Sequence, residues 1–401
     1  MRGFLALLAI VVLACSPAAP GATGPTPVAP SSAGLTAPAS EPTARDSVSP
    51  PAATESVSPT DIASDAPSSA APSDVPSEPP EPPASPDSAV ATLPLAWQLL
   101  GSSDAPAPRS DHTWTVSPDG TAAWLFGGTG ADGPLDDLWR YDLVTDAWQR
   151  VEASGDGPLA RFGHVAAWVE QVGLVIWSGQ AGADFFDDLW AFDPSLGSWK
   201  RLPDGGAIPT ARYGSCAAIG PDGRLWISHG FSHSGRFDDT WTYDFTAGEW
   251  AEVVPDGERP IKRCLHDCLW TPDGRFLLYA GQTDGEPALA DLWSLETDAA
   301  TWSRLDTPEP PEARQLYALA ALGSTAFIFG GSDAERRPLD SLFLLDLDDA
   351  SWSDAQPDGE QPPGRSAATL IADPSRDRLL LLGGIGSDDA LGDLWQLDLG
   401  R

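Results

Sequence analysis

Six arginines recur at nearly constant intervals along this 401-residue chain. Successive members of the set are 51 or 52 residues apart, and the set is Arg109, Arg161, Arg212, Arg263, Arg314 and Arg365. A guanidinium presents five donors in a planar fork that fits carboxylates and phosphates. The spacing therefore predicts either a structural ion pair repeated in every unit or a ring of cationic groups that attracts an anionic ligand.

Histidine follows three of these arginines at the third position, at His112, His164 and His266. Three imidazoles near one axis could bind a metal ion. Ser215 interrupts the set, which favours a packing role, and His229 and His233 in "SHGFSH" lack obvious partner ligands. Acid pairs such as Asp136–Asp137 and Asp187–Asp188 could bind calcium. Because the pairs recur with the repeat, we interpret them as solvated strand starts.

Three cysteines follow Cys15 in the chain, namely Cys216, Cys264 and Cys268. Cys264 and Cys268 would be roughly 13 Å apart along one extended strand, too far to bond each other. A Cys216–Cys264 bridge between neighbouring strands remains open, beside buried thiols. The chain lacks G-x-S-x-G, H-E-x-x-H and P-loop motifs. We therefore predict no catalytic residue, no metal ligand and no cofactor.

The first fifteen residues have the pattern of an export signal, with one arginine followed by the apolar stretch 3–14. This stretch is too short to span a bilayer. It ends in "VLAC", which resembles the lipobox of bacterial lipoproteins and predicts lipidation of Cys15; an ordinary cleaved signal is the alternative. Residues 16–95 are rich in Pro, Ala, Ser and Thr, a composition typical of a disordered linker. We expect the chain to be extracytoplasmic and held to the bacterial cell membrane or envelope by this lipid alone.

The elements that position the arginines are short strands in a repeat of about fifty residues. Each unit has four strand-like runs, which in the first unit are "SDHTWTV", "AAWLFGG", "DLWRYD" and "AWQRV". One tryptophan in the fourth run keeps the period: Trp97, Trp148, Trp199, Trp250, Trp302 and Trp352. Four strands per unit are typical of a propeller blade, whose faces are buried only when blades stack.

The pattern "R-x-x-H … apolar-Gly-Gly … DLW-x-(Y/F)-D … W" resembles the kelch repeat and covers residues 96–401. The resemblance implies an all-β, six-bladed kelch-type β-propeller. The last unit lacks its fourth-strand tryptophan, and Trp97 has no unit before it. We therefore predict that the N-terminal strand closes the last blade, which leaves no exposed sheet edge.

Strand polarity places the long loops between second and third strands on the same face as the connections between blades. The six arginines begin the innermost strands at that face, so we predict them as candidates for binding an anionic feature, such as a carboxylated sugar or an acidic peptide tip. Loops held on a rigid scaffold are common binding sites. An alternative is that the arginines belong to the repeat and hold blades together.

The whole chain has a net charge of −35 and contains lysine at only two positions, Lys200 and Lys262. A basic footprint for nucleic acid is therefore excluded. We predict a monomeric binding module for a protein or carbohydrate ligand. The alternative is a sugar-processing enzyme, because kelch propellers include a periplasmic sialic-acid mutarotase and a copper galactose oxidase. The oxidase is disfavoured, since its family takes a copper ligand from a further domain. A scaffold for an envelope complex is a third possibility.

Overall fold

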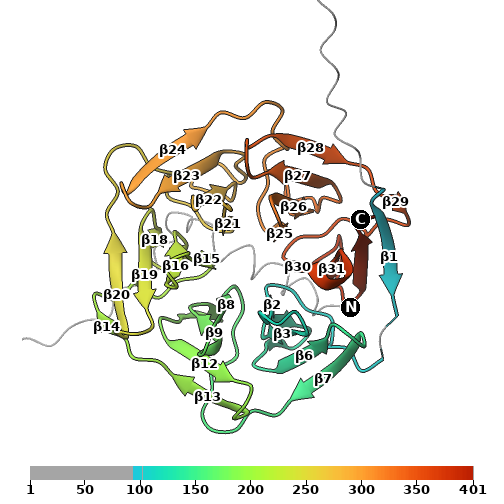
Figure 1. Cartoon of the computed structure of the whole chain (residues 1–401), viewed down its shortest axis with the longest axis horizontal. Helices are drawn as coiled ribbons and strands as arrows, with labels where there is room; N and C mark the ends of the chain where they lie inside the picture. The colour runs from blue at the N-terminus through green and yellow to red at the C-terminus, as the bar shows by residue number, and fades with distance from the viewer. Residues whose placement is uncertain (1–93, 102, 401) are drawn as a thin grey trace, which may run out of the picture. The chain divides into compact units, whose positions relative to one another are not determined.

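The computed structural model describes residues 94–101 and 103–400, which form a six-bladed β-propeller around a central channel (Figure 1). This confirms the predicted fold class. The predicted signal segment (1–15) and linker (16–95) lie outside the described residues, apart from Pro94 and Leu95. No helix in the described ranges is long and apolar enough to cross a membrane.

Every blade is a four-stranded antiparallel sheet whose first strand lines the channel. Blade 1 contains β2 (Thr113–Val116), β3 (Ala122–Phe126), β6 (Leu138–Asp142) and β7 (Ala147–Val151). Blade 2 contains β8 (Val165–Val169), β9 (Gly173–Trp177), β12 (Leu189–Asp193) and β13 (Ser198–Arg201). Blade 3 contains β15 (Cys216–Ile219), β16 (Leu225–Ser228), β19 (Thr240–Asp244) and β20 (Glu249–Val253).

The second half repeats this arrangement. Blade 4 contains β21 (Asp267–Trp270), β22 (Phe276–Tyr279), β23 (Leu292–Glu296) and β24 (Thr301–Leu305). Blade 5 contains β25 (Ala318–Leu322), β26 (Thr325–Phe329), β27 (Leu342–Asp346) and β28 (Trp352–Ala355). Blade 6 contains β30 (Thr369–Asp373), β31 (Arg378–Leu382) and β32 (Leu394–Asp398), and its fourth strand is β1 (Ala96–Leu100).

Strand β1 closes the ring by pairing antiparallel with β32, so that Trp97 lies opposite Leu397. This confirms the prediction drawn from the position of Trp97. In Figure 1, β1 is the cyan strand at the outside of the ring, beside the C-terminal end of the propeller. On its outer edge β1 pairs in parallel with the short β29 (Asp358–Gly359), and β14 (Gly205–Gly206) pairs with β20 in the same way.

Apolar packing joins neighbouring blades at all six seams. Each seam holds its own cluster of buried side chains, for example Trp114 and Leu125 of blade 1 with Leu380 of blade 6. The fourth-strand tryptophans cover these clusters from outside; Trp148 stacks on Trp114 with ring centroids 5.4 Å apart. Because a single blade cannot bury both faces, these contacts between blades are what the tryptophan repeat supplies.

The propeller has two distinct faces. The loop face carries the connections between blades and the loops between second and third strands. Three of these loops contain small hairpins: β4 (Thr129–Gly130) with β5 (Gly133–Pro134), β10 (Gln180–Ala181) with β11 (Asp184–Phe185), and β17 (Phe231–Ser232) with β18 (Gly235–Arg236). The opposite turn face carries the short turns between first and second and between third and fourth strands, including the 3₁₀ turn η1 (Pro374–Arg376).

Candidate functional site

The six repeated arginines are buried inside the blades, each with at most 2% of its surface exposed. Five of them bind the carboxylate that begins the third strand of the same blade through two parallel hydrogen bonds. Arg161 shows the geometry: its two terminal nitrogens donate to the carboxylate oxygens of Asp188 over 2.6 and 3.0 Å, and one also donates to the Ser178 carbonyl. The five pairs are Arg109–Asp137, Arg161–Asp188, Arg212–Asp239, Arg263–Asp291 and Arg365–Asp393.

This geometry corrects two expectations from the sequence. The guanidinium groups do not face the channel, because their donors are used by carboxylates and carbonyls within each blade. The burial of these arginines therefore argues against the predicted role in direct contact with a ligand. The second acid of each predicted pair, such as Asp137, is also not a solvated strand start, because it accepts from Arg109 and from the indole Nε1 of Trp139.

The arginine holds its carboxylate in the charged form. Burial by itself would raise the pKa of Asp291, but hydrogen bonds from Arg263 and the charge of that guanidinium outweigh it and lower the pKa. The indole Nε1 of Trp293 donates to the same carboxylate over 2.7 Å. Each Arg–Asp–Trp group is thus a buried ion pair with further hydrogen bonds, the arrangement that makes burial of two charges tolerable.

Backbone hydrogen bonds tie the arginine segments into a closed ring at the loop face. The residue two after each arginine has a left-handed backbone, and its amide donates to the carbonyl of the equivalent residue in the preceding blade over 2.7–3.1 Å. The ring runs through Asp111, Gly163, Gly214, Leu265, Leu316 and Ala367, and the bond from Asp111 to Ala367 closes it. The segments that carry the arginines therefore form the rim of the channel.

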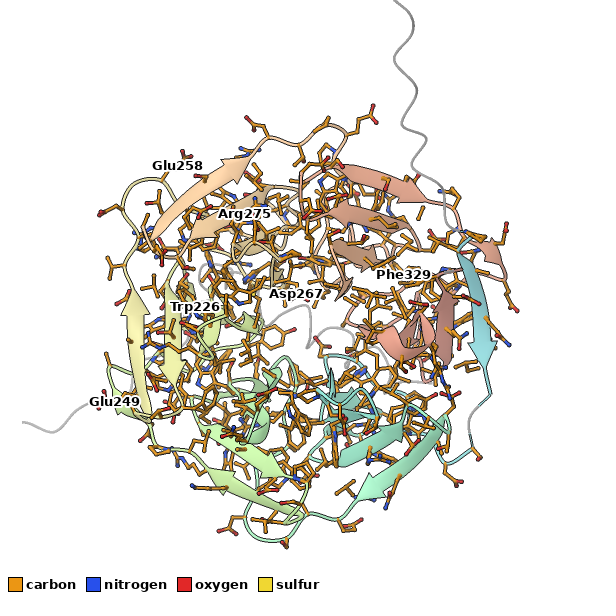
Figure 2. The ribbon with its side chains drawn as sticks, viewed as in Figure 1. Trp226, Glu249, Glu258, Asp267, Arg275 and Phe329 are labelled. Carbon is orange, nitrogen blue, oxygen red and sulfur yellow. A yellow bond between two sulfur atoms is a disulfide. The ribbon has the colours of Figure 1, made fainter. Side chains whose placement is uncertain are left out.

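The channel below this rim has a volume of about 350 Å³ and is lined by the first residues of the innermost strands. Two carboxyl groups line it, those of Asp111 and Asp267, which come from the opposite blades 1 and 4. Figure 2 labels Asp267 beside the central opening. Among the described residues that line the channel, none is Lys or Arg. The channel is therefore acidic, contrary to the basic mouth expected from the sequence.

Both channel carboxyls resist ionisation because they are enclosed. Burial raises the pKa of Asp111 to about 6, although hydrogen bonds from Ser110 and Tyr213 oppose the rise. Burial raises the pKa of Asp267 to about 7, against the opposing hydrogen bond from the Cys268 amide. Near neutral pH each group can therefore either give or accept a proton.

The histidines of the repeat lie at the seams between blades. The ring of His164 packs edge-on against Phe126 and shares a 2.8 Å hydrogen bond with Thr113, while His266 packs against His229. Burial lowers the pKa of His112 to about 3 and holds the pKa of His164 and His266 well below the usual value. The three rings are neutral. Within the described ranges, no three His, Cys, Asp or Glu side chains converge as metal ligands.

The remaining two histidines do not form a pair. His229 is fully buried, and its Nδ1 lies 2.7 Å from the Ser228 hydroxyl. His233 is exposed, and its Nε2 binds the carbonyl of Ala183 in the neighbouring blade over 2.7 Å. Their side chains thus serve different contacts at a seam and on the loop face.

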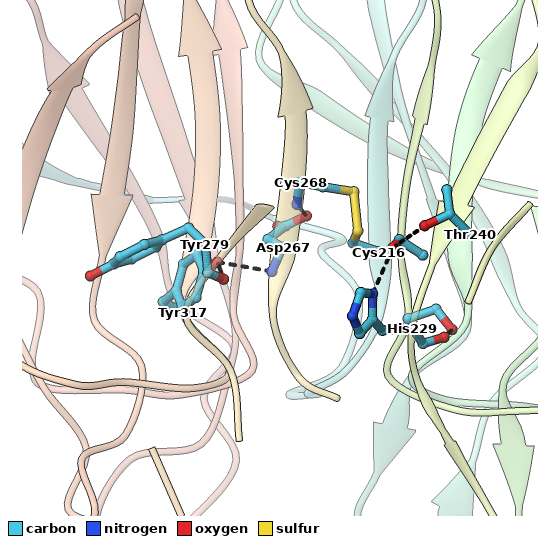
Figure 3. The surroundings of a disulfide bond; sticks show 9 residues. Cys216, His229, Thr240, Asp267, Cys268, Tyr279 and Tyr317 are labelled. Carbon is cyan, nitrogen blue, oxygen red and sulfur yellow. Dashed lines mark hydrogen bonds between the residues drawn. A yellow bond between two sulfur atoms is a disulfide. The ribbon is translucent and has the colours of Figure 1, made fainter. Parts of the chain in front are cut away.

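A disulfide joins Cys216 of blade 3 to Cys268 of blade 4, with 5.6 Å between the Cα atoms. It lies in the channel wall directly beside Asp267 (Figure 3). Both alternatives from the sequence, a bridge from Cys216 to Cys264 and buried thiols at all three positions, are wrong, because Cys216 is bonded to Cys268. Cys264 is buried at the rim, three residues before β21. Cys268 lies four residues after Cys264, within β21, and there it is adjacent to Cys216 at the start of the neighbouring innermost strand β15.

Tyrosine hydroxyls hold the two channel aspartates in place, Asp111 through its carboxyl and Asp267 through its backbone amide. The Tyr213 hydroxyl crosses blade 2 and donates to Asp111 over 3.1 Å. On the other side, the Asp267 amide donates to the Tyr317 hydroxyl over 2.8 Å, and that hydroxyl donates to the Tyr279 carbonyl. Sequence reasoning missed Asp111 and Asp267. The signal in the sequence was an acidic residue at a repeat position where the other five blades have none, which holds for both Asp111 and Asp267.

The loop face is apolar over blades 2 to 4. Phe162, Tyr213, Cys264 and Leu265 form a buried cluster at the rim, and the half-buried Phe185 and Phe231 pack on it. The connections between blades add exposed aliphatic side chains: Leu159, Ile208 and Ile261 have 66%, 44% and 49% of their surface exposed. We call Phe185, Phe231, Leu159, Ile208 and Ile261 the apolar loop patch. Exposed apolar groups gathered on one face are typical of interaction surfaces.

Comparison with known proteins places this geometry in a family. Residues 90–281 and 253–401 match the KLHDC2/KLHL20/DRC7 Kelch-repeats domain. The chain is similar to leucine-zipper-like transcriptional regulator 1 of Pongo abelii, with 29% identity over 275 residues, which is 64% of this chain and 32% of that protein. The chain thus spans about a third of the length of the curated relatives matched first.

Two further relatives match over more of their length. Kelch domain-containing protein 2 of Bos taurus is 27% identical over 303 residues, 66% of this chain and 73% of that protein. N-(sulfonatooxy)prop-2-enimidothioate sulfolyase of Thlaspi arvense is 27% identical over 259 residues, 58% of this chain and 72% of that protein. The family match spans the whole propeller, and its arginine, glycine and tryptophan repeats occupy equivalent places in six blades; this chain belongs to the kelch-repeat family.

Proposed function

We propose that this protein is a lipid-anchored, extracytoplasmic binding module that recognises a protein partner on its loop face. The observation that carries the proposal is the apolar loop patch beside an acidic channel. Aromatic and aliphatic side chains that are desolvated at the centre of an interface supply most of the binding free energy. A partner that presents apolar side chains together with a basic group fits this surface best.

Charge supports a basic rather than an acidic partner. Residues 96–401 contain 49 acidic and 21 basic residues, a net charge of −28. The six arginines that could have offset this charge locally are already paired inside the blades. An anionic sugar or acidic peptide would meet repulsion, whereas a lysine or arginine of the partner would be attracted to the rim.

The Cys216–Cys268 disulfide supports an extracytoplasmic location, because disulfides persist in oxidising compartments. It agrees with the export signal and lipobox at "VLAC", which lie outside the described residues. The test is Cys15→Ser. This variant should leave the detergent phase or accumulate unprocessed, and metabolic labelling with a fatty acid should be lost. Unchanged partitioning and labelling would contradict the anchor.

The test of the loop face uses two variants that each introduce a negative charge into the apolar loop patch, in the native cell envelope. Phe231→Asp and Ile261→Asp should abolish the cross-links that a photo-reactive group on the loop face makes to the partner. Asp222→Ala, on the turn face, should leave them unchanged. Melting temperatures control for folding. Identical cross-links in the folded loop-face variants would contradict the proposal.

A second candidate, a sugar-processing enzyme, rests on one specific observation. Two carboxyls with pKa values of about 6 and 7 share one channel, as acid–base catalysis near neutral pH requires. An anomer-interconversion assay on reducing sugars tests it. Activity that is lost in Asp267→Asn would favour the enzyme, whereas activity indistinguishable from buffer would exclude it for the sugars tested.

A further inference from the structure

A cleft opens on the turn face at the seam between blades 1 and 2, remote from the loop face and the channel. Its volume is about 680 Å³, within the range of about 300–1,000 Å³ that small-molecule sites occupy. Blade 1 contributes Trp124, Asp119 and Arg140 to its walls. Blade 2 contributes Trp168 and the turn residue Glu170. We call it the seam cleft.

The seam cleft exists because two side chains that fill the equivalent seam are missing. At the seam between blades 6 and 1, Arg378 starts β31 opposite Asp398, and its guanidinium reaches Asp146 in the next blade over 2.6 Å. Ala122 is the equivalent of Arg378, because it starts β3 opposite Asp142. Gly197 is the equivalent of Asp146, since each closes its turn with a left-handed backbone and an amide bond four residues back.

The walls of the seam cleft also differ from the filled seam. Trp124 and Trp168 lie with ring centroids 6.2 Å apart, whereas Leu380 and Val116 occupy the same two positions between blades 6 and 1. The seam between blades 3 and 4 repeats the tryptophan pair as Trp226 and Trp270, with centroids 5.4 Å apart. There, however, Arg224 stands at the position of Ala122. An aromatic pair and a small neighbouring residue coincide at the seam cleft.

Polar groups surround the aromatic wall. Asp119 accepts from Ser117 and from the Thr121 amide, and these bonds lower the pKa of Asp119 and keep it ionised. Glu170 and Gln171 are exposed on the β8–β9 turn, and their side chains make no hydrogen bond to other described residues. The buried indole Nε1 of Trp124 also has no partner among the described residues, whereas Trp226 donates to Asp222.

We propose that the seam cleft binds a neutral saccharide. A pyranose presents a C–H face that packs on an aromatic ring, and its hydroxyl groups need acceptors and donors around that ring. Trp168 supplies the half-buried ring, Glu170 and Gln171 supply unengaged polar groups, and Asp119 supplies an ionised acceptor. The carboxylates of Asp119 and Glu170 outnumber the one cationic group among the described residues of the cleft, Arg140. The guanidinium of Arg140 is also already paired with Asp142 over 2.9 Å. An anionic sugar is therefore disfavoured.

The test uses the full chain in detergent and four neutral probes: maltotetraose, cellotetraose, xylotetraose and chitotetraose. Tryptophan fluorescence and calorimetry should give saturable binding of at least one probe. Trp168→Ala should weaken that binding by at least about tenfold. Trp270→Ala, at the equivalent place in the seam between blades 3 and 4, should leave it unchanged.

A second variant tests the cleft itself. Ala122→Arg combined with Gly197→Asp copies the filled seam and should abolish binding while the melting temperature is kept or raised. Arg378→Ala opens the seam between blades 6 and 1 and should create no new binding, because Leu380 and Val116 line it. If the double variant does not fold, the comparison of probe binding by Trp168→Ala and by Trp270→Ala tests the proposal instead.

Three results would overturn the proposal. One is the absence of saturable binding for all four probes at millimolar concentration. Another is binding that the double variant or Trp168→Ala retains at full strength. The third is saturable binding of choline or of galacturonic acid in place of the neutral probes, which would show that charge rather than the sugar ring is recognised.

Discussion

The aspartates within the blades and those in the channel show opposite behaviour in one molecule. Asp188 lies against Arg161 and keeps its charge although it is mostly enclosed, because the guanidinium outweighs the cost of burial and lowers its pKa. Asp267 has no such partner, and burial raises its pKa to about 7. A local counter-charge, rather than the degree of burial, therefore decides whether a buried carboxyl stays ionised in a structural pair or can exchange a proton near neutral pH.

Blade 5 is the natural exception within the first set. Ser341 replaces the aspartate, and Arg314 donates to its hydroxyl over 3.2 Å. Phe343 replaces the tryptophan that would otherwise need that carboxylate, and the guanidinium lies 5.0 Å from its ring. Burial lowers the pKa of Arg314. The two replacements are compatible with each other, because an indole N–H at position 343 would be buried without an acceptor once Ser341 stands in place of the aspartate.

The largest expected effect comes from removal of a counter-charge within a blade. Arg161→Ala leaves Asp188 and the Ser178 carbonyl without their donors and should lower the free energy of unfolding by about 3–5 kcal/mol. Urea denaturation measures this. The matched surface change Arg201→Ala should cost less than about 0.5 kcal/mol. A loss for Arg161→Ala no larger than for Arg201→Ala would contradict the structural role.

Conversion of blade 4 to the blade 5 pattern should have the next largest effect. Asp291→Ser removes the acceptor of the Trp293 indole and the carboxylate partner of Arg263. Because the serine hydroxyl can still accept from Arg263, as Ser341 does from Arg314, the cost should be about 1.5–3 kcal/mol. Addition of Trp293→Phe should recover part of that loss, because it removes the unsatisfied donor. A double-mutant cycle measures the coupling. Strict additivity would show that the paired replacement in blade 5 has another cause.

A smaller effect is expected from the channel carboxyl Asp267, whose raised pKa should make the stability of the protein depend on pH. The folded-state pKa of Asp267 is raised above its unfolded value of about 4, so stability should fall as pH rises from about 4 to 7. Asp267→Asn should remove about 1–2 kcal/mol of that fall, since the side chain is only half-buried and lines the channel. Thermal unfolding at several pH values measures this. Identical pH profiles would contradict the raised pKa.

The smallest effect concerns the exposed acid near Arg314. Glu312 lies 3.8 Å from that guanidinium, with 56% of its side chain exposed. Glu312→Gln should therefore change the free energy of unfolding by less than about 0.5 kcal/mol. A loss of more than about 1 kcal/mol would mean that Glu312 is the true counter-charge of blade 5, in place of Ser341.

The architecture could be predicted from the repeat alone. The period of the arginines and tryptophans predicted six blades, and the unmatched Trp97 predicted closure by the N-terminal strand, because a propeller leaves no place for an unpaired fourth strand. These features follow from local strand patterns and a fixed repeat length. They were predictable because each blade is built the same way and contacts only its neighbours.

The chemistry of the interior depends on contacts between blades and could not be predicted from the repeat. The repeat could not show whether the side chain of Arg109 points into the channel or toward Asp137 inside the blade. Either orientation is compatible with an arginine at the start of an innermost strand. The Cys216–Cys268 pairing, the acidic channel at Asp111 and Asp267, and the cleft beside Ala122 all depend on which side chains meet across a seam. Such contacts join residues about fifty or more positions apart, and their energies depend on burial and on the neighbouring charge, which no single repeat unit contains.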